Sequence, residues 1–168
     1  AYFFLPEFFI KDIPPIATTD IVVKRPEIYY GETPNDYVFV KTKALEFDYP
    51  SGAENVYTTY QGKGGVPVSS FLRKLAFSTY FGSLKIILSN DITPESRIMY
   101  LRRIEQRVKK VTPFITYDQD PYLVITNEGR VVWILDGYTT TDKIPYSQPL
   151  EGLGNYIRNS VKATVDAY

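Results

Sequence analysis

The sequence predicts an α+β fold, in which a mainly antiparallel sheet carries two principal helices packed on one face. Segments with strand patterns come first along the 168 residues, two helical segments follow, and strand patterns return at the end. A short Gly-containing loop at 127–129 joins two apolar segments and indicates an antiparallel hairpin. A chain of this length can bury a core as one domain, which we assign to residues 26–168.

Residues 1–25 form a Pro-rich segment with little periodicity, which is typical of an extended arm. Its aromatic and aliphatic side chains make it too apolar for a free linker. We expect this arm to pack on the domain or on something outside the chain.

Alternating side chains from Tyr37 to Tyr49 predict one long strand that ends at Pro50. A turn at Ser51-Gly52 and a second strand over 55–60 follow, so the two strands form a hairpin-like pair.

Two helices follow. Ser69 or Ser70 is a suitable N-cap for a helix that we expect to be buried on several sides, because its apolar residues surround much of its circumference. A further helical turn or two is expected over 84–88. Thr93-Pro94 resembles the start of a second principal helix, which runs to about Val111 and has an apolar stripe.

Strands are expected again over 121–126, 130–137 and 157–167. Residues 131–135 are all apolar, which indicates that both faces of that strand are covered. The last strand continues almost to Tyr168 without a turn, so we expect the domain to be truncated at the C-terminus.

The composition removes several classes of function. Lys plus Arg equal Asp plus Glu at 19 each, and the zero net charge argues against a nucleic-acid partner. The chain has no Cys and no His, which excludes thiolate nucleophiles, Cys/His zinc sites and imidazole-dependent catalysis. No segment is long and apolar enough to cross a bilayer. We therefore expect a binding domain rather than an enzyme, with no cofactor.

Arg97 stands out because it falls on the apolar stripe of the expected helix over 94–111. A buried guanidinium requires a carboxylate or several carbonyl partners. Asp118, Asp120 and Asp136 are candidate partners in a buried ion pair, and the alternative is that these residues bind a ligand in a cleft. The other cations of this helix are expected on a solvated face, with a nucleic-acid interface as the alternative.

Gly62, Lys63 and Gly64 lie in a Gly-rich loop between a strand and a helix, where backbone amides can bind a phosphate or carboxylate. The loop lacks the spacing of a P-loop or of a dinucleotide fingerprint. These three residues are ligand-binding candidates, and a plain turn is the competing interpretation.

Five acids lie near the second group of strands: Asp118, Asp120, Glu128, Asp136 and Asp142. Oxygen ligands suit Ca²⁺ or Mg²⁺, but no calcium-binding loop is present and we expect no metal site. A carboxylate pair with Tyr and Trp133 would suit a carbohydrate-active or carbohydrate-binding domain, which is the alternative function.

Six motifs together resemble the bacterial uncharacterised protein family 0182. They are Arg25–Glu32, Glu46–Pro50, Gly62–Val66, Ile92–Arg97, Tyr117–Tyr122 and Asn155–Lys162. The resemblance implies a multi-pass protein of the bacterial cell membrane, with this segment in a large region on the extracytoplasmic side. It implies no activity for any residue. We expect a domain that interacts with a protein, with a saccharide or another ligand, or with the membrane part of the same polypeptide.

Overall fold

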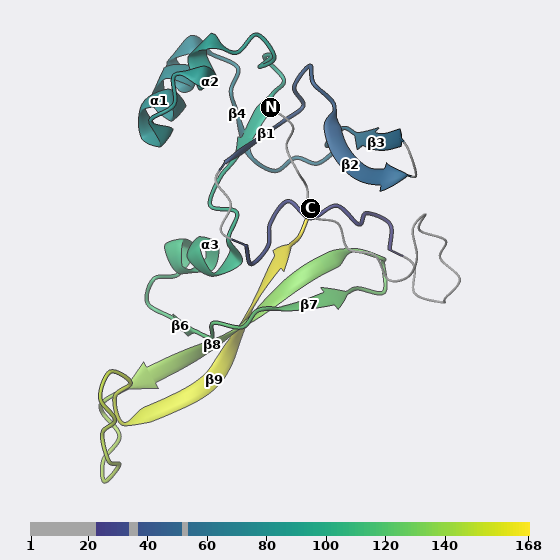
Figure 1. Cartoon of the computed structure of the whole chain (residues 1–168). Helices are drawn as coiled ribbons and strands as arrows, with labels where there is room; N and C mark the ends of the chain where they lie inside the picture. The colour runs from purple at the N-terminus through teal and green to yellow at the C-terminus, as the bar shows by residue number, and fades with distance from the viewer. Residues whose placement is uncertain (1–22, 34–36, 52–53) are drawn as a thin grey trace.

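The structure is a computed structural model that describes residues 23–33, 37–51 and 54–168 (Figure 1). The expected arm at 1–25 therefore lies outside the described residues except for its last three. There, the amide of Lys24 donates to the carbonyl of Gly129 at 2.9 Å, and Val23 packs beside Val131. The end of the arm lies against the hairpin loop.

The α+β class with mainly antiparallel strands is confirmed, but the strands divide among three sheets. The first has the order β1 (Val38–Val40), β5 (Arg97–Met99) and β4 (Val66–Pro67). The second pairs β2 (Glu46–Ser51) with β3 (Glu54–Thr58). The third contains β6 (Thr116–Tyr117), β7 (Tyr122–Ile125), β8 (Val131–Thr141) and β9 (Tyr156–Asp166).

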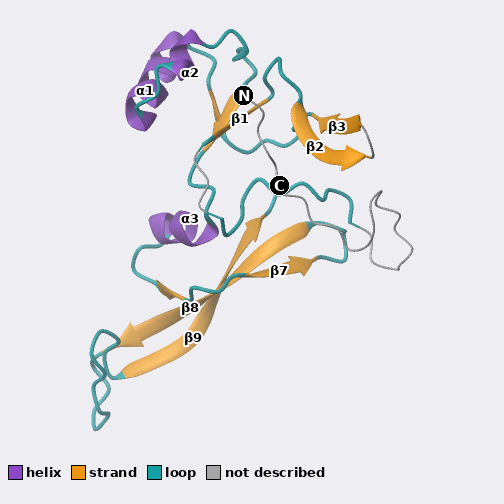
Figure 2. Cartoon of the chain, viewed as in Figure 1, coloured by secondary structure: helices purple, strands orange, loops and turns teal. Residues whose placement is uncertain are grey.

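The helices are α1 (Phe71–Phe81), α2 (Lys85–Leu88) and α3 (Ile104–Val111), and they do not share one sheet face. Side chains of α1 and α2 pack with Phe39 and Ile98 of the first sheet. Helix α3 packs with Leu135 of the third sheet, and Figure 2 shows it separated from α1 and α2. The described chain therefore has separate apolar clusters under different helices.

The expected long strand over 37–49 is wrong, because β1 and β2 belong to different sheets. Lys41 has a positive φ of 57° and turns the chain between them. Its carbonyl accepts a hydrogen bond from Ser96 Oγ at 2.9 Å, and its amide donates to the Glu46 carboxylate at 3.1 Å. The hairpin-like pairing itself is confirmed by β2 and β3.

The expected helix over 94–111 begins only at Ile104. Thr93 starts a tight turn, in which its carbonyl accepts from the Ser96 amide at 3.1 Å. The next residues form β5, the central strand between β1 and β4. Strand pairing with distant segments thus replaces the first turns of the helix.

The last strands agree with the sequence. The amide of Thr126 donates to the carbonyl of Arg130 at 2.9 Å, and Gly129 takes a φ of 75° in the hairpin loop. Strand β8 is central, with β7 and β6 on one side and β9 on the other. The amides of Tyr29 and Tyr30 donate to the carbonyl of Ala167, which joins the start of the described chain to its end.

Candidate functional site

Arg97 and the Gly-rich loop, two separate candidates in the sequence, lie together in the structure. The guanidinium donates to the carbonyl oxygens of Gly64, Lys63 and Gly65 at 2.6, 2.9 and 2.8 Å. It projects from β5 toward the loop that precedes β4. The expected carbonyl partners of Arg97 are therefore present, and they are supplied by the loop.

The same loop uses its backbone internally. The Gly64 amide donates to the Tyr60 hydroxyl at 2.9 Å. Burial raises the pKa of Tyr60, which keeps the phenol neutral. Because the carbonyls bind Arg97 and this amide binds Tyr60, the arrangement is that of a braced turn. A ligand at Gly62, Lys63 and Gly64 remains a prediction.

The three aspartates predicted near Arg97 lie elsewhere. Asp136 pairs with Lys162, which also contacts the Tyr122 hydroxyl at 3.2 Å. Asp118 accepts from the amide of Gln119 at 2.7 Å. These residues make no ion pair with Arg97, so the expected buried ion pair at that residue is wrong.

Asp120 lines a separate polar cavity of about 180 Å³. The other lining residues are Glu32, Arg103, Glu105, Gln119 and Pro121. Glu105 is already paired with Arg103 at 3.2 Å and Lys109 at 2.8 Å, and the Lys109 hydrogen bond lowers the pKa of its carboxyl group. Across the described ranges, no group of three or more acids is placed to hold a metal ion.

The carbohydrate alternative required carboxylates beside exposed rings. Trp133 is half-buried in the core, and its indole N–H donates to the Tyr30 carbonyl at 2.9 Å. Asp136 is engaged by Lys162, and Asp120 lies in the other cavity. The described residues thus do not assemble these acids and Trp133 into one cleft.

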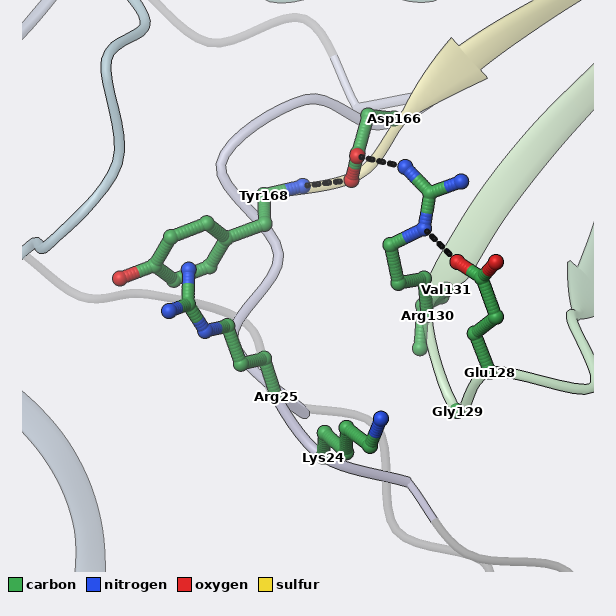
Figure 3. A pocket seen from close by; sticks show the side chains of 8 residues that line it. All are labelled: Lys24, Arg25, Glu128, Gly129, Arg130, Val131, Asp166 and Tyr168. Carbon is green, nitrogen blue, oxygen red and sulfur yellow. Dashed lines mark hydrogen bonds and ion pairs between the residues drawn. The ribbon is translucent and has the colours of Figure 1, made fainter.

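A cavity that sequence reasoning missed lies where three distant segments meet (Figure 3). Its volume is about 250 Å³, and it is lined by Lys24, Arg25, Glu128, Gly129, Arg130, Val131, Asp166 and Tyr168. Arg130 pairs with Glu128 at 3.3 Å and with Asp166 at 3.5 Å. The Cζ atom of Arg25 lies over the Tyr168 ring, 4.6 Å from the ring centroid. These exposed ion pairs contribute little to folding stability. The cations and carboxylates that line the cavity largely neutralise one another.

A buried polar pair, Tyr29 with Glu46, was also absent from the sequence candidates. The Tyr29 hydroxyl donates to the Glu46 carboxylate, and both residues are buried. Burial, the bond to Glu46 and its negative charge raise the pKa of Tyr29. The nearby Glu27 and Asp48 each hold one buried carboxylate oxygen without a hydrogen-bond partner. Burial raises the pKa of Glu27, and Asp48 adds to that shift.

Helix α1 differs most from its expected environment. Ser70 caps it as predicted, since its Oγ accepts from the Arg73 amide at 3.4 Å. Burial on several sides is wrong: Phe77 and Phe81 pack inward, but Ser78 is the one buried residue of α1.

Large apolar side chains of α1, α2 and their connection are instead exposed by between 41% and 75%. They are Phe71, Leu72, Leu75, Tyr80, Leu84 and Leu88, and we call them the α1–α2 surface. Phe71, Leu72 and Leu75 occupy adjoining positions on one side of α1, and exposed apolar side chains at adjoining positions are typical of an interaction surface. This surface is the strongest functional feature of the described chain.

Comparison with known proteins places the chain in a family. The sequence profile of the uncharacterised protein family UPF0182 matches residues 4–168. UPF0182 proteins of Geobacter sulfurreducens, Trichlorobacter lovleyi and Geobacter strain M21 are 59%, 57% and 56% identical over 164 residues. Each match covers 98% of this chain and 18% of the relative.

The chain therefore spans about a fifth of the length of these curated relatives. No solved structure matches it. Within the described part, no helix combines the length and apolar character needed to cross a membrane. From the profile match and the identities, the chain belongs to the uncharacterised protein family UPF0182.

Proposed function

We propose that the chain is an interaction domain on the extracytoplasmic side of a bacterial integral membrane protein, and that its α1–α2 surface packs against another part of the same polypeptide. The observation that carries the proposal is the exposure of this surface. The membrane location rests on what membership of the family implies.

Energetics support a covered surface. Full burial of a Leu or Phe side chain contributes roughly 1.5–3 kcal/mol, so leaving several exposed forgoes much stabilisation. Leu72 and Leu88 are about three-quarters exposed on neighbouring helices. The first turn of α1 also carries Arg73 and Lys74, so two cations border its exposed apolar side chains.

The length of the relatives supports another part of the same polypeptide as the partner of the α1–α2 surface. Because the match covers 18% of each relative, most of such a polypeptide lies outside these residues. A segment tethered to the domain binds at a high effective concentration. It therefore competes well against a second copy of the domain for the α1–α2 surface.

Cysteine labelling of the full-length protein tests the proposal. Leu72→Cys would be placed in a Cys-free background, with Lys110→Cys on the exposed face of α3 as the control. In spheroplasts, we expect a membrane-impermeant maleimide to label the Lys110 variant rapidly and the Leu72 variant roughly tenfold more slowly. Denaturation should equalise the two rates.

Three outcomes would contradict the proposal. Equal labelling of both variants in the native protein would mean that the surface is free. Loss of the protection on detergent extraction would indicate lipid, and a Leu72→Cys crosslink between differently tagged copies would indicate a second copy. Labelling of the Lys110 variant only after permeabilisation would contradict the extracytoplasmic location.

A further inference from the structure

The β8–β9 ribbon extends away from the rest of the domain (Figure 1). Ten residue pairs join the two strands, from Val132 opposite Asp166 to Thr141 opposite Tyr156. In β9, Val161, Ala163 and Val165 pack against the cluster under α3, whereas residues 156–160 are all exposed. The ribbon is therefore anchored at one end only.

Strand β9 has an open edge. Strand β8 has β7 and β6 along one side and β9 along the other, so its backbone is paired on both sides. Among the described residues, β9 pairs only with β8. In an antiparallel pair, alternate residues direct both their N–H and their C=O groups away from the partner. Along β9 these groups form a row without backbone partners in the described chain.

A β-bulge divides the open edge of β9 into two segments. Gly137 lies opposite Val161 and Tyr138 opposite Asn159, so Ser160 is the extra residue. A bulge discourages pairing at its own position. The segment 161–166 beyond it has six residues, no Pro and no Gly, and about the length of an ordinary strand. The opposite edge of the sheet is made of β7 and β6, which have four and two residues.

We propose that residues 161–166 of β9 accept a further β-strand from a segment of the same polypeptide that lies outside these 168 residues. The half-buried Val161, Ala163 and Val165 alternate with the exposed Lys162, Thr164 and Asp166. The incoming strand should therefore alternate apolar and polar residues, and its apolar side chains extend the cluster under α3.

Two arguments favour the same polypeptide as the source of the added strand: the length of the relatives and the hazard of an unpaired strand edge. The curated relatives extend far beyond the matched region, which supplies the chain for an added strand. A long open edge that paired with copies from solution would promote association between molecules. A strand from the same polypeptide removes the edge within one molecule. This inference uses a different surface from α1–α2 and does not depend on that proposal.

Hydrogen exchange at single-residue resolution in the full-length protein tests the pairing. If the edge is free, exchange rates should alternate along residues 161–166. Amides that donate to β8 would exchange slowly, and amides that point away from β8 would exchange fast. An added strand predicts slow exchange at every one of these amides, as in the central strand β8. Alternating exchange would overturn the proposal.

Photo-crosslinking identifies the occupant. Thr164→Cys, exposed on β9, would carry a benzophenone maleimide, and Glu128→Cys in the β7–β8 loop would report nonspecific capture. We expect the Thr164 label to crosslink to a peptide outside this chain within the same molecule. A crosslink to a second isotope-labelled copy, one to residues 1–168, or none beyond the control would overturn the proposal.

Discussion

Arg97 donates a 2.6 Å hydrogen bond from Nε to the carbonyl oxygen of Gly64 and thereby connects the central strand of the first sheet to the loop before β4. The terminal NH2 nitrogen of the same guanidinium reaches the carbonyls of Lys63 and Gly65. One side chain thus holds three consecutive carbonyl groups, a geometry that suits the planar fork of arginine and no other cation.

Replacing Arg97 tests this brace. Arg97→Lys keeps the charge but removes the fork, and we expect it to lower the free energy of unfolding by about 2 kcal/mol, because hydrogen bonds to charged groups are the stronger ones. Urea unfolding of the purified protein measures the change. Arg73→Lys is the matched control, since Arg73 makes one exposed side-chain bond to the Pro67 carbonyl. Equal stability of Arg97→Lys and the control would refute the brace.

The Ser96 side chain is fully buried and hydrogen-bonds to two segments of the chain. Its Oγ accepts from the Thr93 amide at 2.9 Å and donates to the Lys41 carbonyl at 2.9 Å. Ser96→Ala should lower the free energy of unfolding by roughly 1–3 kcal/mol, because a buried amide and carbonyl lose their partner. Ser69→Ala, at an exposed position, is the control, and chemical denaturation compares the two. An unchanged free energy of unfolding in Ser96→Ala would show that the turn needs no hydroxyl.

The raised pKa of Glu27 has a consequence for stability against pH. Burial disfavours its carboxylate, Asp48 and Glu46 add repulsion, and Arg25 offsets part of the shift. A folded-state pKa above the ordinary 4.5 means that the folded protein binds this proton more tightly than the unfolded chain. The resulting stabilisation is present below the unfolded pKa and is lost as pH rises through the folded pKa.

We therefore expect Glu27→Gln to unfold at a higher urea concentration than wild type at pH 7, and the difference to shrink as pH falls through the folded pKa. Urea midpoints measured from pH 4 to pH 7.5 compare the two proteins over a range that begins below the ordinary carboxyl pKa and extends well above it. Glu128→Gln is the matched control, because it makes the same substitution at an exposed position. A Glu27→Gln protein less stable than wild type at pH 7 would reverse the sign and contradict the assignment.

Gly137 allows close packing at the bulge in the β8–β9 ribbon. A Cβ there would lie 2.9 Å from Tyr117 Cε1 and 3.1 Å from Val161 Cβ. We expect Gly137→Ala to cost about 1–3 kcal/mol of stability through overpacking. Gly152→Ala is the comparison, because its Cβ meets nothing within 4 Å and only the positive φ of 79° opposes it. If thermal unfolding ranked Gly152→Ala as the worse variant, packing at Gly137 would not be limiting.

Local patterns determined much of the secondary structure. The hairpin around Gly129, the long strand β9 and the Ser70 cap of α1 were all predictable. Each depends on residues close together in sequence, where turn chemistry, alternation and capping act within a few positions.

Pairing between distant segments decided the rest. Thr93-Pro94 has the residues of a helix start, but Arg97–Met99 pairs with β1 and β4, and those hydrogen bonds outweigh a weak helix preference. Lys41 breaks an alternating pattern because its backbone groups bind Ser96 and Glu46, which no local signal reveals. The assignment of 26–168 as one domain stays a prediction.

The sequence by itself determined the family, the α+β class and the absence of Cys and His chemistry, because composition and motifs are properties of the chain alone. Only the tertiary structure decided that Arg97 meets carbonyls instead of Asp118, Asp120 or Asp136. It also decided that Leu72 is exposed, because burial depends on which segments pack above a helix and not on the apolar character of the helix.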